Sequence, residues 1–243
     1  HSAACAVANI MAQPVTPCAL EFMDGKAIAL AQEDAPADLP AGAGTLLMIE
    51  VDGFEDQLDE LAAHLIEAAR VEGLVEIRQA RDDDEVRTLW QVRKALSPAL
   101  RRVAPKKINE DVVVPVSRMP ELVDELAGLS RKHDLSIVNF GHAGNGNLHV
   151  NLLYDPGRKG EEQRARACLG ELFERVLAME GSISGEHGIG VVKRDWVGSE
   201  LDRTSQQLMH AIKQQFDPRS ILNPGKTLPA TGERDSAPAG RIA

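Results

Sequence analysis

Two histidines flank a strong turn signal near the middle of the chain. Residues 142–151 read His-Ala-Gly-Asn-Gly-Asn-Leu-His-Val-Asn, and Asn-Gly favours a two-residue type I′ hairpin turn because both loop positions need φ > 0. With Asn145-Gly146 as the loop, His142 lies directly opposite His149, and their Cβ atoms are about 4.5–5.5 Å apart on one face. Two neutral imidazoles this close suit one metal ion, or they form a hydrogen-bonded cross-strand pair. Asn151 follows on the same face.

A second polar motif occurs in a glycine-rich segment. Residues 184–188 read Ser-Gly-Glu-His-Gly, and glycine on both sides lets the backbone approach a ligand closely or adopt unusual φ/ψ angles. The adjacent Glu186 and His187 could supply one metal ligand and one base. A turn is also where polar residues ordinarily occur.

Two further polar groups stand out. Arg93 and Ser97 are one helical turn apart and face the same way, and residues 223–226 form an Asn-Pro-Gly-Lys turn after the last expected helix. Each group taken alone is equally well explained as a solvated helix residue or an ordinary turn.

Hydrophobic periodicity predicts the elements that position these residues. Strands are expected over 17–23, 46–51, 74–78, 111–116, 135–140 and 148–154, and helices over 2–12, 54–72, 82–103, 117–133, 160–179 and 200–216. This order favours an α+β fold with helices on one face of a largely antiparallel sheet, built from duplicated strand–helix–strand units in a ferredoxin-like manner. A doubly wound parallel sheet fits less well, because the one clear hairpin is antiparallel.

Composition narrows the class of protein. Hydrophobic residues make up 43% of the 243 residues and aromatic residues only 3%, which predicts an aliphatic core. The formal net charge of −10 argues against a nucleic-acid partner, because phosphate binding needs clustered positive charge. Three widely spaced cysteines without a CxxC motif support neither a disulfide framework nor a thiolate zinc site, so a reducing, cytoplasmic compartment is expected.

The two ends of the chain also carry information. The first residues lack an initiating Met and the basic flank of a signal peptide, which indicates the middle of a longer protein. Residues 228–243 are rich in Pro, Ala, Gly and charge and are predicted to be a disordered tail.

Several motifs together resemble a known family. They are, in chain order, the segments 140–149, 181–190, 216–218 and 221–226, with shorter similarities over 19–24, 90–94 and 110–115. The chain resembles the C-terminal domain of the FAD-linked oxidases, which include D-lactate dehydrogenase, D-2-hydroxyglutarate dehydrogenase and the FAD-linked subunit of glycolate oxidase. The likeness spans about residues 17–227, and we assign residues 1–227 to this domain.

The resemblance implies a function for each candidate residue. It implies a zinc or manganese ion on His142, His149 and Glu186, with His187 as the general base. It also implies substrate contacts from Arg93, Ser97 and Asn151, and a segment near the flavin at Asn223, Gly225 and Lys226. The implied reaction transfers hydride from C2 of a 2-hydroxy acid, of the D-lactate, glycolate or D-2-hydroxyglutarate type, to FAD.

Two departures from the family bear on this interpretation. Asn145 stands where Asp is usual, and it serves the turn equally well. Asn109 stands where some members have a carboxylate-binding Lys; Lys107 could replace it, which leaves the identity of the substrate open.

The resemblance also implies partners. The N-terminal FAD-binding domain of the family has no counterpart in this chain, so the chain alone is expected to bind no FAD and to be inactive. The expected partners are the 2-hydroxy acid, that FAD-binding domain of the same protein, and an unidentified electron acceptor through which the protein could associate with a membrane. An apolar face left by separation of the domains could also pair two copies as a homo-oligomer. Two alternatives are a metal-dependent hydrolase and a non-catalytic module that binds a metal or small molecule.

Overall fold

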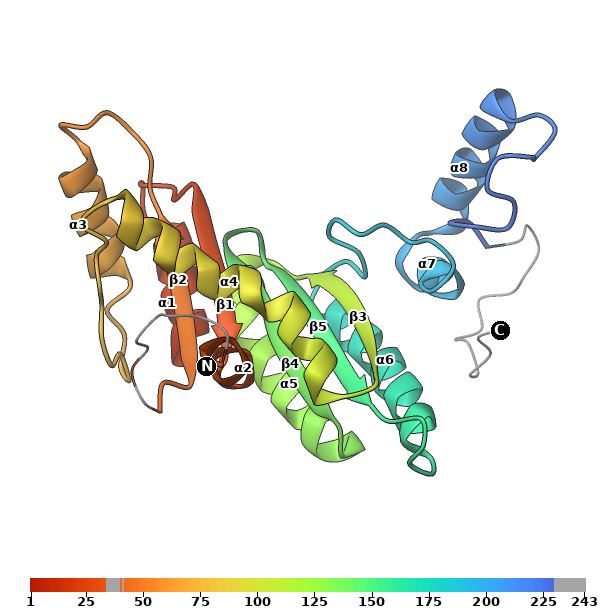
Figure 1. Cartoon of the computed structure of the whole chain (residues 1–243). Coiled ribbons are helices and arrows are strands. Elements are labelled where there is room, and N and C mark those ends of the chain that lie inside the picture. The colour runs from red at the N-terminus through yellow and green to blue at the C-terminus, as the bar shows by residue number, and fades with distance from the viewer. Residues whose placement is uncertain (34–39, 41, 230–243) are drawn as a thin grey trace.

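A five-stranded sheet forms the centre of the molecule (Figure 1). The computed structural model describes residues 1–33, 40 and 42–229. Its strands are β1 (Ala19–Asp24), β2 (Thr45–Glu50), β3 (Lys106–Val113), β4 (Ser136–His142) and β5 (Asn147–Tyr154). Its α-helices are α1 (Ser2–Ala12), α2 (Gly25–Gln32), α3 (Leu58–Ala68), α4 (Asp83–Val103), α5 (Met119–His133), α6 (Glu161–Ala178), α7 (Val197–Glu200) and α8 (Arg203–Phe216).

The sheet confirms the α+β class with antiparallel pairing. Its strand order is β2-β1-β4-β5-β3, and every neighbouring pair is antiparallel. The unit β3–α5–β4 is a strand–helix–strand pass with β5 inserted between its two strands. The unit β1–α2–β2 instead joins two adjacent antiparallel strands, so the two passes are not copies of one arrangement.

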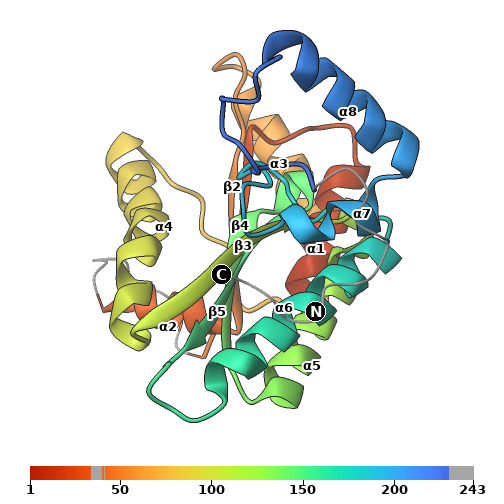
Figure 2. The same cartoon turned by 90° about the vertical axis from the view of Figure 1, so that its right-hand side faces the viewer.

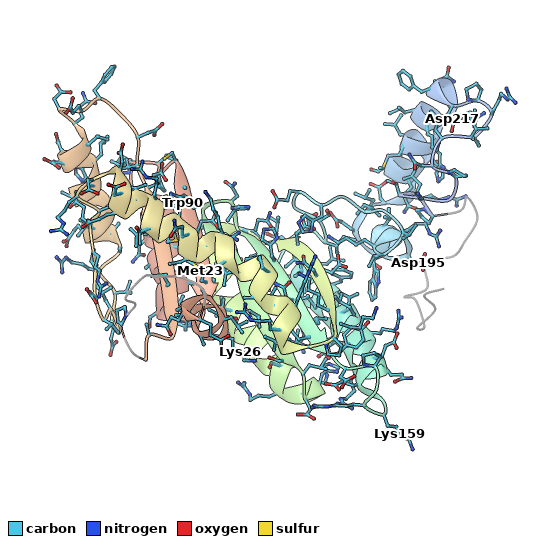
Figure 3. The ribbon with its side chains drawn as sticks, viewed as in Figure 1. Met23, Lys26, Trp90, Lys159, Asp195 and Asp217 are labelled. Atoms are coloured by element: carbon cyan, nitrogen blue, oxygen red, sulfur yellow. The ribbon has the colours of Figure 1, made fainter. Side chains whose placement is uncertain are left out.

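Helices cover both faces of this sheet rather than the single face that the sequence predicts. Helices α1, α5 and α6 pack over one face, and α2 and α4 pack over the other (Figure 2). The physical reason lies in the inner strand β5, whose side chains are buried at every position except the last. A strand buried on both sides needs a cover on each. Figure 3 labels Met23 of β1 and Trp90 of α4, which both belong to the apolar cluster between the sheet and the helices α2 and α4.

The central hairpin differs in register from the prediction. Phe140, not His142, lies opposite His149, because a 3-10 turn over Ala143–Asn145 replaces the two-residue type I′ loop. Gly146 closes this turn at φ +69°, where an added Cβ would lie 1.9 Å from the carbonyl oxygen of Val114. His142 is therefore a diagonal neighbour of His149 on the same face.

Three other segments depart from the sequence expectations. Helix α2 is not predicted, although Asp24 caps it by accepting a hydrogen bond from the backbone N–H of Ala27 at 2.8 Å. Residues 74–78 form no strand, because among the described residues no strand pairs with them, and Val75 is 71% exposed. Strand β3 begins at Lys106, before the expected 111.

The C-terminal helices lie beyond the β3 edge of the sheet (Figure 1). None of the side chains of α8 is buried, and its face of Leu208, Ile212 and Phe216 is exposed. The tail predicted over 228–243 lies outside the described residues from 230 onward, while Leu228 is buried. In the described part of the chain, every helix is too short or too polar to cross a membrane.

Candidate functional site

Polar side chains gather on the face of the sheet that α2 and α4 cover. The strand register places Glu21 of β1 opposite His142 of β4, and Asp111 of β3 opposite His149 of β5. Opposed residues point to the same face of a sheet. Four strands therefore contribute polar groups to one region. This region lies on the same face of the sheet as the buried apolar side chains of Met23 and Phe140.

The two hairpin histidines meet a carboxylate from a distant segment. The His142 and His149 rings have centroids 5.3 Å apart. Glu186 Oε1 lies 3.5 Å from His142 Nε2 and 3.3 Å from His149 Nε2. The structure thus brings together the three residues that the sequence proposes as metal ligands.

A short bridge to β3 places the glycine-rich segment beside the hairpin. The Val113 N–H donates to the Ser182 carbonyl at 3.0 Å, and the Ser182 N–H donates to the Val113 carbonyl at 2.8 Å. An added Cβ on Gly185 would lie 2.7 Å from Asn147 Nδ2 and from Val113 Cγ2. Only glycine lets the turn approach β5 and β3 this closely, and that approach brings Glu186 to the histidines.

His149 is the neutral centre of this cluster. Burial, followed by the proximity of His142 and His187, lowers its pKa to about 4, so its imidazole is uncharged at neutral pH, as a metal ligand must be. The ring of His187 stacks on it with centroids 5.1 Å apart and an interplanar angle of 10°. The predicted base therefore lies directly beside the predicted ligand set.

Glu21 links the hairpin to α4. Its buried carboxylate accepts a hydrogen bond from Arg93 Nε at 2.6 Å and one from His142 Nδ1. The Arg93 guanidinium also lies over the Phe140 ring, 4.7 Å from the centroid. Because the Glu21 carboxylate only accepts, the neutral His142 ring carries its proton on Nδ1. Its Nε2 lone pair, on the side of Glu186, is therefore available to a metal ion.

The other two predicted substrate-binding residues are Asn151 and Ser97. Asn151 is fully buried; its Nδ2 donates to the carbonyls of Val138 at 3.1 Å and His149 at 3.2 Å, and its Oδ1 accepts from Asn109 Nδ2 at 2.8 Å. Its polar atoms are thus engaged within the sheet. Ser97 lies on α4, and its side chain falls outside the described residues.

The predicted flavin-side residues lie elsewhere in the molecule. Asn223, Gly225 and Lys226 form an exposed turn after α8. Asp217, labelled at the end of α8 in Figure 3, accepts hydrogen bonds from the Ile221 and Leu222 N–H groups at 2.9 and 3.0 Å. Arg194 Nη1 donates to the Gly225 carbonyl at 2.6 Å. These contacts hold the turn at the surface of the molecule.

The donor set fits a divalent cation. The ligand atoms of His142, His149 and Glu186 lie within 4.8 Å of one another. Two ligand atoms about 2.0–2.2 Å from one zinc ion at the tetrahedral angle are about 3.3–3.6 Å apart, which matches the separations of Glu186 from both histidines. Two imidazoles with one carboxylate could hold zinc or manganese and leave coordination positions open.

Four charged residues of this region are given no role by the sequence motifs. They are Glu21, Glu110, Asp111 and Lys193, all buried. The signal available in the sequence is a carboxylate within an apolar strand, as in Leu-Glu-Phe-Met and Asp-Val-Val-Val. Charges are almost never fully buried unless they are paired, so each such carboxylate indicates a partner, but the identity of that partner depends on the fold.

Known proteins are similar in sequence to this chain over nearly its whole length. The sequence model of the family described as "FAD linked oxidases, C-terminal domain" matches residues 1–227. Among curated relatives, glycolate oxidase subunit GlcD of Bacillus subtilis (strain 168) is 34% identical over 93% of this chain and 48% of its own length. A D-lactate dehydrogenase of Anaerostipes hadrus is 30% identical over 87% of this chain and 46% of its own length. The chain spans about half the length of these relatives.

A solved structure shares the fold. The structure of p-cresol methylhydroxylase with substrate bound superposes with a TM-score of 0.69 at 17% identity, covering 95% of this chain and 52% of that chain. At this identity the likeness concerns the fold alone. The family match over residues 1–227, together with the sequence relatives, shows that the chain belongs to the FAD-linked oxidases, as their C-terminal domain.

Proposed function

We propose that this chain is the substrate-binding and metal-binding domain of an FAD-dependent 2-hydroxyacid oxidoreductase. The observation that carries the proposal is the meeting of His142, His149 and Glu186 at metal-ligand separations, with His187 stacked on one of these ligands. The family supports FAD as the cofactor, and the names of the relatives favour glycolate or D-lactate as substrate. D-2-hydroxyglutarate is the third member of the same substrate class.

Each residue of the site has a defined task in this proposal. His142, His149 and Glu186 would hold the divalent cation. Arg93 binds the substrate carboxylate through its Nη atoms while its Nε atom stays on Glu21. His187 faces the same region and accepts the proton of the substrate hydroxyl.

The overall reaction balances as a two-electron oxidation. The C2–H bond breaks with its electron pair, the O–H proton moves to His187, and a 2-oxo acid remains. When they are bound, the cation would acidify the substrate hydroxyl and the flavin would accept the hydride. Arg93 and His187 orient the substrate so that the proton transfer and the hydride transfer take place on one bound molecule.

The partners and location follow as further proposals. The FAD-binding domain of the same protein completes the site, and the exposed Asn223–Lys226 turn packs near the flavin. The electron acceptor is a separate partner. Two copies of the protein associate through an apolar face as a homo-oligomer. We place the protein in the cytoplasm, with any membrane contact made through the acceptor. Neither the hydrolase nor the non-catalytic module gains support from the family.

The decisive experiment is anaerobic reduction of the flavin in the full-length protein. We expect glycolate, D-lactate or D-2-hydroxyglutarate to bleach the flavin absorbance, and the His187→Asn variant to lose about 10²–10⁴-fold in the rate of bleaching. The matched control is His64→Asn, on the exposed side of α3, which should behave as the wild type. Equal rates in the His187 and His64 variants, or hydrolysis of an ester by the protein without flavin, would overturn the proposal.

A further inference from the structure

A buried ion pair lies next to the Gly-Glu-His turn. Asp111 is 0% exposed and Lys193 is 1% exposed; the first lies on the edge strand β3 and the second follows the glycine-rich segment. Taking two charges out of water is unfavourable unless further hydrogen bonds satisfy both. Such a pair therefore needs a complete set of partners.

The partners of Asp111 are the backbone of the functional residues themselves. Its Oδ2 atom accepts hydrogen bonds from the N–H of Glu186 and, at 2.9 Å, from the N–H of His187. Its Oδ1 atom accepts from Lys193 Nζ and lies 3.5 Å from His187 Nδ1. One carboxylate thus fixes two consecutive peptide groups, those of the predicted metal ligand and the predicted base.

Lys193 is satisfied as completely as Asp111. Its Nζ atom contacts the Asp111 carboxylate, the Asp111 carbonyl oxygen at 3.2 Å and Glu110 Oε2 at 3.3 Å. Three acceptors match the three protons of an ammonium group. Burial alone would raise the pKa of Asp111, but the hydrogen bonds from Lys193, Glu186 and His187 lower it to about 2.

The segment that this pair holds has little intrinsic rigidity. Gly185 permits its close approach to β5, while Gly188 and Gly190 adopt φ values of +76° and +58°. Glycine has the widest backbone freedom of any residue. Without an external tether, the Glu186 and His187 side chains would sample many positions relative to the hairpin histidines.

We propose that Asp111 and Lys193 are positioning residues that hold the Glu186–His187 turn against the hairpin before a cation or substrate binds. The proposal rests on the proposed function for the meaning of the site, but the ordering of the turn can be tested separately. Neither residue contacts the substrate in this role. Asp111 acts through the backbone of its neighbours, and Lys193 acts by compensating the charge of Asp111.

The test uses the full chain and compares Asp111→Asn, Lys193→Met and the double variant with the wild type. We expect Asp111→Asn to weaken Zn²⁺ binding, measured by calorimetric competition, about 10–100-fold. Hydrogen exchange followed by mass spectrometry should show faster exchange in peptides covering 183–190, with the hairpin peptides unchanged. The double variant removes the Asp111 charge together with its partner and leaves only the Glu110 carboxylate without Lys193. It should therefore regain part of the stability lost in Lys193→Met, but not Zn²⁺ affinity.

The matched control is Glu171→Gln, which breaks an ion network between α5 and α6 away from the site. It should lower stability while leaving Zn²⁺ affinity and exchange over 183–190 unchanged. Wild-type affinity and wild-type exchange in folded Asp111→Asn, or affinity loss of equal size in Glu171→Gln, would overturn the positioning role. If the wild type binds no Zn²⁺, the metal part of the proposed function fails, and the exchange of 183–190 alone decides this inference.

Discussion

At the residue scale, His142 owes its orientation to a side chain on the neighbouring strand. Glu21 holds His142 Nδ1 and Arg93 Nε with its two carboxylate oxygens. A ligating histidine whose second nitrogen is held by a carboxylate has a fixed tautomer and greater basicity. Glu21 thereby couples the predicted metal ligand to the residue proposed to bind the substrate carboxylate.

Replacing Glu21 with Gln should therefore affect the cation rather than the fold as a whole. A neutral amide cannot accept from both His142 and Arg93 with the same strength, so we expect Zn²⁺ affinity to fall about 10-fold. The matched control is Glu50→Gln, since Glu50 also joins a strand to α4 by accepting from Trp90 Nε1 at 2.7 Å but touches no histidine of the site. Calorimetry on both variants makes the comparison, and equal affinities would remove Glu21 from the metal site.

At the element scale, the sequence predicts most of the strands and helices but not the register between them. The Asn-Gly signal is correct for a turn, yet Gly141 and His142 pair with Phe22 and Glu21 of β1 instead of closing a short hairpin. That choice depends on a strand more than one hundred residues upstream, which no local pattern contains. Local periodicity likewise cannot show that residues 74–78 lack a pairing partner.

The site is predictable to a similar degree. Histidines and a Gly-Glu-His turn are recognisable by type and spacing, and the structure brings His142, His149, Glu186 and His187 together. The role of Lys193 is not predictable in this way, because a lysine after a glycine-rich segment is ordinarily solvated. Its burial depends on the bridge that places this segment on β3.

The ion network between α5 and α6, on the face of the sheet opposite the site, predicts how the stability of the chain depends on pH. Glu171 of α6 accepts hydrogen bonds from Lys132, His133 and Arg175, and these bonds, led by Lys132, lower its pKa to about 2. The unfolded pKa is about 4.3, so the stabilisation is complete above that pH and is lost as the pH falls toward 2. We expect the free energy of unfolding to fall more steeply between about pH 5 and 2 in the wild type than in Glu171→Gln. Parallel curves from urea titrations at each pH would contradict this coupling.

At the scale of the whole molecule, the polar site and the exposed apolar surface lie in different regions. The site occupies the sheet face beside α4, whereas α8 lies beyond the β3 edge (Figure 1). A helix normally gains its stability by packing an apolar face, and α8 has such a face without burying any of its residues. Its first turn is capped by Asp202, whose side chain accepts from the Ser205 N–H at 2.8 Å.

This arrangement predicts that the apolar face of α8 contributes little to the stability of the chain. Leu208, Ile212 and Phe216 are 61%, 51% and 83% exposed, so replacing all three with Ser should change the free energy of unfolding by no more than about 0.5 kcal/mol per site. In contrast, Leu126→Ala removes a side chain that is 1% exposed in the core under α5 and should cost about 2–5 kcal/mol. Urea denaturation of both variants tests the contrast. A triple variant as unstable as Leu126→Ala would mean that α8 packs against the rest of the chain in solution.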